Sequence, residues 1–185
     1  MTAFQIVQSI YWLALTIWFG GLVFIAVAWP VIFTVVKEED PTLPRVLSVN
    51  VDHDHAGLLA GTIVGSLIRH IGFIQLCCAA VVLLMLVCQW FVISESWHNR
   101  LSGIARCSFF VGSAIMLVVD RYVVWPKAWK AREDFIENAD DPDKANVICE
   151  RFIRHQRESV RLMLYQLVLL SLVVVFSSAI TPRWY

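Results

Sequence analysis

The sequence predicts an all-α membrane protein with four transmembrane helices. Of its 185 residues 58% are hydrophobic and the mean hydropathy is +0.67, whereas soluble domains are typically about 45–50% apolar. Three stretches contain no charged side chain: residues 1–36, 71–94 and 162–182. Each exceeds the roughly 20 residues that a helix needs to cross a bilayer. A fourth apolar run, residues 101–126, is interrupted only by Arg106, Asp120 and Arg121.

The first transmembrane helix is predicted over residues 5–36. Gly20 and Gly21 reduce the side-chain bulk near its middle, so a neighbouring helix can pack closely there. Pro30 removes a backbone donor, and a kink is expected at that point. The charged residues 37–40 and the proline that follows them oppose continuation, so the helix is expected to end there.

The second helix is predicted over residues 70–94, preceded by an amphipathic helix over residues 57–69 that lies at the membrane interface. A single helix covering both would reach well beyond a hydrocarbon core of about 30 Å. Gly57, Gly61 and Gly65 recur every four residues and share one helical face. This glycine face predicts close packing against another helix, either of the same chain or of a partner membrane protein.

The third and fourth helices are predicted over residues 102–126 and 162–180. A short polar turn separates helices 2 and 3, which makes them antiparallel neighbours. Residues 127–161 are the most charged part of the chain. They are expected to form a large cytoplasmic loop, helical in pieces around the break at residues 140–143. The whole chain is predicted to be one integral membrane domain.

The distribution of Lys and Arg predicts the topology. Residues 37–69 and 121–161 contain twelve of the fifteen basic side chains. Basic residues are enriched on the cytoplasmic side, so both large loops are expected in the cytoplasm and both termini outside, in a bacterial inner membrane. The partner implied first is the lipid bilayer. The net charge is zero, which gives no general attraction to nucleic acid.

Short motifs recur in the two halves of the chain. Trp29-Pro30 near the end of the first helix parallels Trp125-Pro126 near the end of the third. Ile68-Arg69-His70 before the second helix parallels Ile153-Arg154-His155 before the fourth. These matches suggest two hairpins of the same orientation, related by a pseudo-repeat.

Four motifs in order together resemble the transmembrane protein 205-like family, whose bacterial members carry a domain of unknown function. They are Trp18-Phe-Gly-Gly21 leading to Trp29-Pro30-Val-Ile-Phe33, Ala60-Gly61-Thr-Ile-Val-Gly65-Ser-Leu67, Asp120-Arg121-Tyr-Val-Val-Trp-Pro126, and Phe152-Ile-Arg-His155-Gln-Arg-Glu-Ser159-Val-Arg-Leu162. The chain departs from the family pattern at Arg69-His70, where an aromatic pair is usual, and at Met163-Leu164, where an asparagine is usual. The resemblance implies a small multi-helix membrane protein and supplies no catalytic residues, so the chain is not expected to be an enzyme.

A layer of polar side chains is predicted near the cytoplasmic ends of the helices: Asp120, Arg121, Arg69 and Arg161. A carboxylate at the edge of the hydrocarbon is costly unless it is paired, so Asp120 should have a cationic partner. Arg161 is the first candidate and Arg69 the second. The pair would act as a clamp between helices or as a proton or ion step. We favour the clamp, because arginine readily extends its charged end to this depth.

His70 and His155 suggest a haem, because a bis-histidine haem in a four-helix bundle takes one ligand from each of two facing helices. The two residues are predicted at different depths. His70 directly precedes its apolar run, whereas His155 precedes its own by seven residues, about 10 Å along a helix. A haem is therefore not favoured, and no cofactor is expected.

Asp52, His53, Asp54 and His55 are metal-ligand types in close succession. Alternate residues of an extended loop point to the same side, so the two histidines or the two aspartates would share an ion. The alternatives are a solvated surface loop, or a loop in which Asp54 caps the helix that follows. A specific metal site is the less favoured of these interpretations.

Three functional hypotheses follow. The leading one is a non-catalytic accessory or assembly subunit that acts by helix packing through Gly57, Gly61 and Gly65. The alternative is a small transporter or resistance factor that uses the Asp/Arg layer at the cytoplasmic side. A bis-histidine haem or other redox membrane protein comes third.

Overall fold

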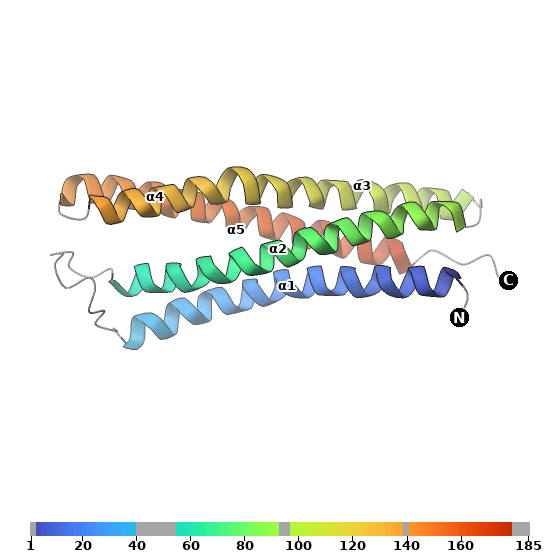
Figure 1. The fold of residues 1–185 in the computed structure, drawn as a ribbon, viewed down its shortest axis with the longest axis horizontal. Coiled ribbons are helices and arrows are strands. Elements are labelled where there is room, and N and C mark those ends of the chain that lie inside the picture. The colour runs from blue at the N-terminus through green and yellow to red at the C-terminus, as the bar shows by residue number, and fades with distance from the viewer. Residues whose placement is uncertain (1–2, 40–54, 93–96, 139–140, 179–185) are drawn as a thin grey trace. The chain divides into compact units, whose positions relative to one another are not determined.

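The computed structural model of the chain describes residues 3–39, 55–92, 97–138 and 141–178, which are helical almost throughout and contain no strand. The elements are α1 (Ala3–Glu39), α2 (His55–Val92), α3 (Trp97–Val119), the π-helical turn η1 (Asp120–Val124), α4 (Trp125–Glu137) and α5 (Pro142–Ser178) (Figure 1). The helical runs contain four segments long and apolar enough to cross a membrane: Gln5–Val36, Ile63–Gln89, Leu101–Phe135 and Val147–Ser178. The predicted all-α class and the four spans are confirmed.

The second span differs from its prediction, because α2 is one helix of 38 residues rather than an interfacial helix followed by a transmembrane one. Neither proline nor a capping residue interrupts it between Gly57 and His70. A single glycine such as Gly72 costs only about 1 kcal/mol inside a helix. The exposed Arg69 and His70 change the surface of α2 without ending the helix.

Most of the expected cytoplasmic loop over residues 127–161 is helical. α3, η1 and α4 follow one another without a break, so the third helical run extends to Glu137 (Figure 1). The fourth begins at Pro142 instead of residue 162. The prediction that this stretch is helical in pieces around residues 140–143 agrees with α4 and α5. The helix ends expected at residues 126 and 162 do not agree, because only the apolar runs end there. Hydropathy locates the part of a helix that suits a membrane, whereas charged residues are good helix formers in water.

The start of α5 is defined by local chemistry at the predicted break. The Asp141 carboxylate accepts a hydrogen bond from the backbone N–H of Lys144 at 3.3 Å, and Pro142 occupies the first helical position. Both features are typical of helix N-termini. The Lys144 ammonium also lies 2.7 Å from Asp141 Oδ2, and this contact raises the pKa of Lys144. The charged stretch is therefore two helices joined at a capped break.

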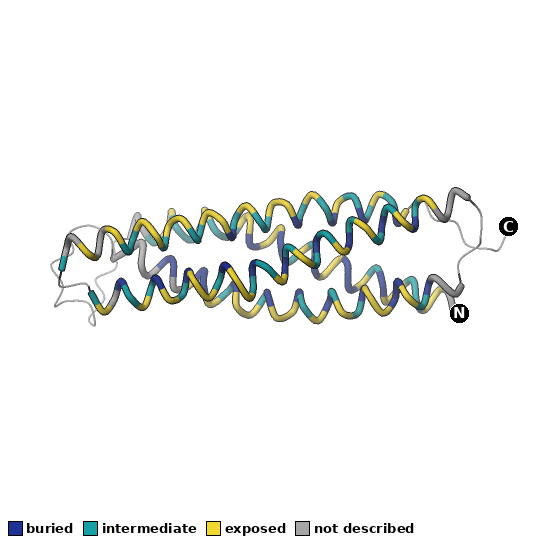
Figure 2. Tube along the Cα trace, turned by 90° about the horizontal axis from the view of Figure 1, so that it is seen from above, coloured by how far each residue is buried: buried dark blue, intermediate teal, exposed yellow. Residues whose placement is uncertain are grey.

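The described chain forms two compact units, where the sequence predicts one domain. Unit 1 comprises residues 1–23, 72–118 and 162–185, and unit 2 comprises residues 24–71 and 119–161. Unit 1 contains the main hydrophobic core, whose largest fully buried members are Tyr11, Leu15, Trp18, Val82, Leu170 and Val173. The indole of Trp18 packs edge-on against Phe110, with ring centroids 6.0 Å apart. Buried and exposed residues alternate along each helix at the helical period (Figure 2).

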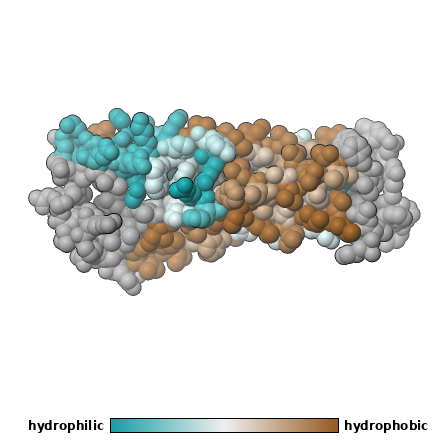
Figure 3. Space-filling view, in the orientation of Figure 1, coloured by the Kyte–Doolittle hydropathy of each residue, from teal (hydrophilic) through white to brown (hydrophobic). Residues whose placement is uncertain are grey.

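The surfaces of the two units differ in polarity. The exposed side chains of unit 1 include large apolar residues on all four helices, among them Leu13, Leu84, Ile104 and Val168. Such a surface matches lipid rather than water. In unit 2, α1 still exposes Val27 and Val31, whereas α4 exposes Lys127 and Lys130. Figure 3 shows the hydrophilic side chains gathered over α4 and the hydrophobic ones over α3 and α1.

The π-helical turn η1 accommodates one extra residue in the third helical run. The buried positions of this run are Gly103, Arg106, Phe110, Ser113, Leu117, Asp120, Val124, Ala128, Ala131 and Phe135. Their spacing alternates between three and four until Asp120, after which two steps of four follow each other. A single widened turn keeps both flanking segments facing inward.

In that turn the N–H of Trp125 donates to the carbonyl of Asp120, five residues earlier. Pro126, which has no N–H to donate and would crowd an α-helical carbonyl, follows immediately.

Candidate functional site

Asp120 is the buried acid of unit 2, and only 6% of its surface is exposed. It is the first residue of η1, and single π-helical turns are frequent at functional sites. Its Oδ1 atom is buried and accepts no hydrogen bond from the residues that the structure describes. A buried carboxylate needs a cation, a hydrogen-bond donor or a proton to offset its lost hydration. The surroundings of Asp120 therefore decide what this site does.

The groups that interact with the Asp120 carboxyl are the hydroxyl of Ser159 on α5 and the guanidinium of Arg121. Ser159 is 2% exposed, and its Oγ forms no hydrogen bond of acceptable geometry. Two buried polar groups thus lie near each other with unused hydrogen-bonding capacity. Such pairs are usually completed by an ordered water or a proton.

The predicted pairing of Asp120 with Arg161 is not found in the described part of the chain, and neither is the pairing with Arg69. Arg161 is exposed. It lies two residues from Ser159 on α5, and residues two apart in a helix point about 200° away from each other. Because Ser159 faces the carboxyl, Arg161 points away from it. Arg69 is exposed as well. The sequence analysis therefore predicts the level of both arginines along their helices correctly, but their side chains lie on the side that faces away from Asp120.

Arg121 connects η1 to α2 through the backbone of Arg69. Its Nη2 atom donates a hydrogen bond to the carbonyl oxygen of Arg69 at 3.0 Å. Its Nη1 atom is buried and forms no hydrogen bond within the described parts of the chain. Arg121 therefore joins two helices near the acid without forming an ion pair with it, and two of the four predicted layer residues are in contact.

The glycine face of α2 packs inside the chain. A Cβ atom at Gly61 would lie 3.7 Å from the ring of Phe152 on α5, and one at Gly65 would lie 3.1 Å from Cη2 of Trp125 on α4. Gly57 lies in α2, but its surroundings are outside the described residues. The glycines at 61 and 65 thus leave space for bulky aromatic side chains of this protein. The sequence left open whether this face served the chain or a partner, and these two contacts are internal.

The glycines predicted to thin α1 show no comparable contact. Gly20 is exposed, and a Cβ atom there would meet nothing within 4 Å. Gly21 is half-buried. A packing role is therefore not found for Gly20, because its face of α1 is turned outward.

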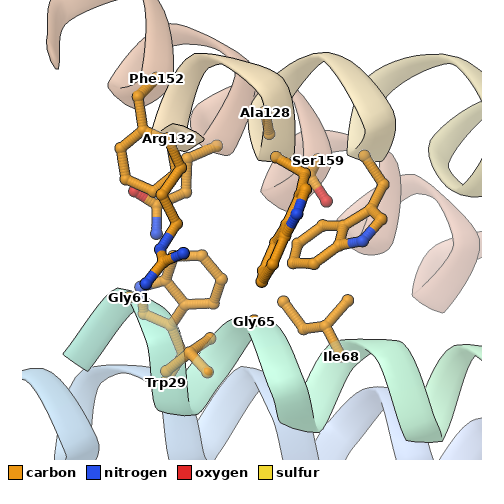
Figure 4. Close-up of a pocket in the computed structure, with 12 residues that line it drawn as sticks. Trp29, Gly61, Gly65, Ile68, Ala128, Arg132, Phe152 and Ser159 are labelled. Atoms are coloured by element: carbon orange, nitrogen blue, oxygen red, sulfur yellow. The ribbon is translucent and has the colours of Figure 1, made fainter. Parts of the chain in front are cut away.

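A small aromatic pocket lies beside the glycine face in unit 2 (Figure 4). Its lining comes from all four helical runs: Trp29, Gly61, Val64, Gly65, Ile68, Trp125, Ala128, Trp129, Arg132, Phe152, Gln156 and Ser159. The guanidinium of Arg132 lies 5.0 Å from the ring centre of Trp129, a cation–π contact. Figure 4 shows Gly61 and Gly65 on α2 opposite Ala128 on α4 and Ser159 on α5.

The size of this pocket limits its contents. It encloses about 20 Å³ of space open to a water-sized sphere, and one water needs roughly 10–15 Å³ by this measure. As it stands, the pocket holds about one water molecule and no large organic ligand. Ser159 lines the pocket and also interacts with Asp120. The pocket therefore provides a place for water next to the buried acid.

The two histidines of the predicted haem pair each bond within their own helix. His70 Nδ1 donates to the carbonyl oxygen of Ser66 at 2.8 Å, one turn earlier on α2. His155 Nδ1 donates to the carboxylate of Glu158 at 3.0 Å on α5. Both contacts are local, and neither residue lines the aromatic pocket.

The predicted metal ligands lie mostly outside the described residues. This is so for Asp52, His53 and Asp54, whereas His55 is the first residue of α2. Within the parts of the chain that the structure describes, no three His, Cys, Asp or Glu side chains come together to hold a metal ion.

A second polar cluster, in the core of unit 1, escaped the sequence analysis. Arg106 is 3% exposed, and its Nη1 atom donates to Oε1 of Gln89 at 2.8 Å. Gln89 in turn donates through Nε2 to Oε1 of Gln8 at 2.7 Å. The Arg106 guanidinium also lies 5.4 Å from the ring centre of Tyr11, whose hydroxyl is 2.6 Å from Ser177 Oγ. Five polar side chains from four helices thus meet inside an apolar bundle.

This network surrounds a buried cation with neutral groups. The only acidic side chain in the sequence of unit 1 is Glu95, which lies outside the described residues. The sequence did contain a signal, because Arg106, Ser113 and Asp120 follow one another at intervals of seven on one helical face. From hydropathy alone, Arg106 is only an interruption of an apolar run.

The fold and the site define a multi-pass helical membrane protein with a buried acid beside a water-sized pocket. No family model, no curated protein and no solved structure matches the chain. The function of the site is therefore inferred from Asp120, Ser159 and the pocket themselves.

Proposed function

We propose that the chain is a small, non-catalytic transporter of the bacterial inner membrane that takes up and releases a proton at Asp120. The observation that carries this proposal is the buried Asp120 carboxyl, which forms no ion pair with any described residue and lies beside the buried Ser159 hydroxyl. The carboxyl lies at the level of Ser159, where the charge-free part of the helices ends, and buried ionisable residues of membrane proteins commonly mark proton or ion pathways. A water molecule in the pocket lined by Ser159 would supply the proton.

The charges around Asp120 are consistent with this role. A salt bridge would keep the carboxylate ionised, whereas Arg121 interacts with it without forming one. Arg132, which lines the pocket together with Ser159, lies over the ring of Trp129. A proton is small enough to reach a buried carboxyl, and protonation removes the cost of a buried charge.

The accessory-subunit hypothesis loses one of its supports, the glycine face. It required the glycine face to be available to another protein, and Gly61 and Gly65 are covered by Phe152 and Trp125 of the same chain. We also propose the topology predicted from the basic residues, with both termini outside and α4 in the cytoplasm. Membership of the transmembrane protein 205-like family stays a proposal that rests on the motifs alone.

Proton flux in proteoliposomes tests the proposal. The full chain is reconstituted with a pH-sensitive dye inside, and a potassium gradient with valinomycin supplies the driving force. The wild-type protein should acidify or alkalinise the lumen faster than empty vesicles. Asp120→Asn should abolish the flux, because an amide cannot take up the proton. It should still fold, because it removes a buried charge at nearly constant size.

Glu137→Gln is the matched control. Glu137 is an exposed carboxylate on α4, so its neutralisation should leave the flux unchanged. Absence of any flux in the wild type would contradict the proposal. So would an unchanged flux in Asp120→Asn, because the proton would then pass by another route.

A further inference from the structure

Helix α5 carries four exposed arginines on one side, Arg151, Arg154, Arg157 and Arg161, which we call the arginine stripe. Their spacing of three, three and four residues places one on each successive turn within about a third of the circumference. None of these four side chains has a role in the proposed proton step. Each also lies on a different face from the buried Ser159.

The stripe ends where the lipid-facing part of α5 begins. Arg161 is followed by Leu162, the first residue of the charge-free run, and α5 passes through this point without a break. Beyond it, the exposed residues of the helix are apolar: Leu164, Tyr165 and Val168. A side chain at this boundary lies at the level of the lipid headgroups.

The helical rise gives the depth of each arginine. Measured from Arg161, Arg157 lies about 6 Å further out, Arg154 about 10 Å and Arg151 about 15 Å. The headgroup layer on each side of a bilayer is roughly 5–8 Å thick. Arg161 and Arg157 therefore fall within this layer and Arg151 falls beyond it. Arginine side chains suit phosphate especially well, because two parallel N–H groups can bind two oxygens.

The local charge balance favours an anionic partner. The stretch from Glu150 to Arg161 contains four arginines and two glutamates, which leaves an excess of positive charge. One of the glutamates, Glu158, already accepts a hydrogen bond from His155. Clusters of basic residues immediately next to a transmembrane segment attract anionic lipids.

We propose that the arginine stripe binds the headgroups of anionic phospholipids, with Arg161 and Arg157 making the contacts. The effect of each arginine falls with its distance from the membrane, because charges beyond about 8–10 Å are screened at physiological salt. The stripe fixes the height of α5, and with it the height of Ser159, relative to the membrane surface.

The test compares the full chain in nanodiscs of phosphatidylcholine with the same chain in nanodiscs that also contain phosphatidylglycerol. The apparent Tm of the wild type should be higher with phosphatidylglycerol. Arg161→Gln and Arg157→Gln should each lose most of this lipid-dependent shift. Arg151→Gln, the same change on the same side of α5 but further out, should retain it. Arg161→Lys should retain part, because it keeps the charge and loses the paired N–H groups.

Two results would overturn the proposal. The first is the same Tm of the wild type in both lipids. The second is an equal loss of the shift in Arg151→Gln and Arg161→Gln, which would indicate a general charge effect. If a variant is too unstable for melting, native mass spectrometry counts the phosphatidylglycerol molecules retained by the purified protein. That count should fall in Arg157→Gln and stay unchanged in Arg151→Gln.

Discussion

Gly65 of α2 lies against the indole of Trp125 so closely that a Cβ atom would come within 3.1 Å of Cη2. This contact explains why a glycine occupies the middle of a long helix, where it costs stability relative to alanine. Trp125 follows the π-helical turn directly, so the glycine, the widened turn and the pocket belong to one local arrangement. Its consequence is that the glycine face serves the fold of this chain.

The two described glycines of this face should respond differently to alanine. At Gly61 the new methyl group would be 3.7 Å from Phe152, an ordinary contact, so Gly61→Ala should stabilise the protein by about 0.5–1 kcal/mol. At Gly65 the methyl group would press on a large ring, and this strain should offset the gain. Chemical unfolding in detergent measures both variants. Equal stabilisation by the two substitutions would contradict the close contact with Trp125.

The network in unit 1 predicts an asymmetry between its members. Gln89→Leu leaves the buried guanidinium of Arg106 without its acceptor and should destabilise the protein by about 1.5–3 kcal/mol. Arg106→Met removes the cation itself and should cost less, because a buried charge is expensive to keep. When Gln89→Leu is combined with Arg106→Met, the loss of stability caused by Gln89→Leu alone should largely disappear, because no buried cation then lacks its acceptor. Unfolding of all three variants checks this, and additive losses would contradict it.

The exposed apolar surface of unit 1 predicts where an added charge blocks membrane insertion. Leu84 is 57% exposed on α2, and Leu84→Arg should cost about 2.5–3.5 kcal/mol if lipid surrounds it. Val147 is 51% exposed on the charged part of α5, so Val147→Arg should change insertion little. The measurement is the yield of membrane-integrated protein. Equal yields for the two variants would show that Leu84 does not face lipid.

The π-helical turn predicts opposite effects of deletion and insertion. Tyr122 is 66% exposed within η1, and deleting it should convert the widened turn into an ordinary one. Both flanking faces would stay inward, so the variant should fold with a similar circular dichroism spectrum and a modestly changed Tm. Inserting an alanine after Tyr122 would rotate α4 by about 100° and should lower the Tm strongly. A deletion as harmful as the insertion would contradict the single-residue interpretation.

The sequence by itself determined the class of protein, the number of spans and the helical face that Gly61 and Gly65 share. These follow from quantities that composition and periodicity report directly, the length of apolar runs and the face on which a residue lies. The sequence also indicated the break between α4 and α5 at residues 140–143. It did not indicate that the third and fourth helical runs continue beyond their apolar parts, because hydropathy distinguishes lipid from water and does not distinguish helix from coil.

Only the tertiary structure decided which groups meet. A period of four in Gly61 and Gly65 marks a packing face without saying whether Trp125 of the same chain or another protein fills it. The depth of Asp120 could be inferred, but its neighbour is Ser159 rather than Arg161, because a difference of two positions on α5 reverses the direction of the side chain. The cluster around Arg106 joins residues far apart in sequence, and only the packing of the helices brings them together.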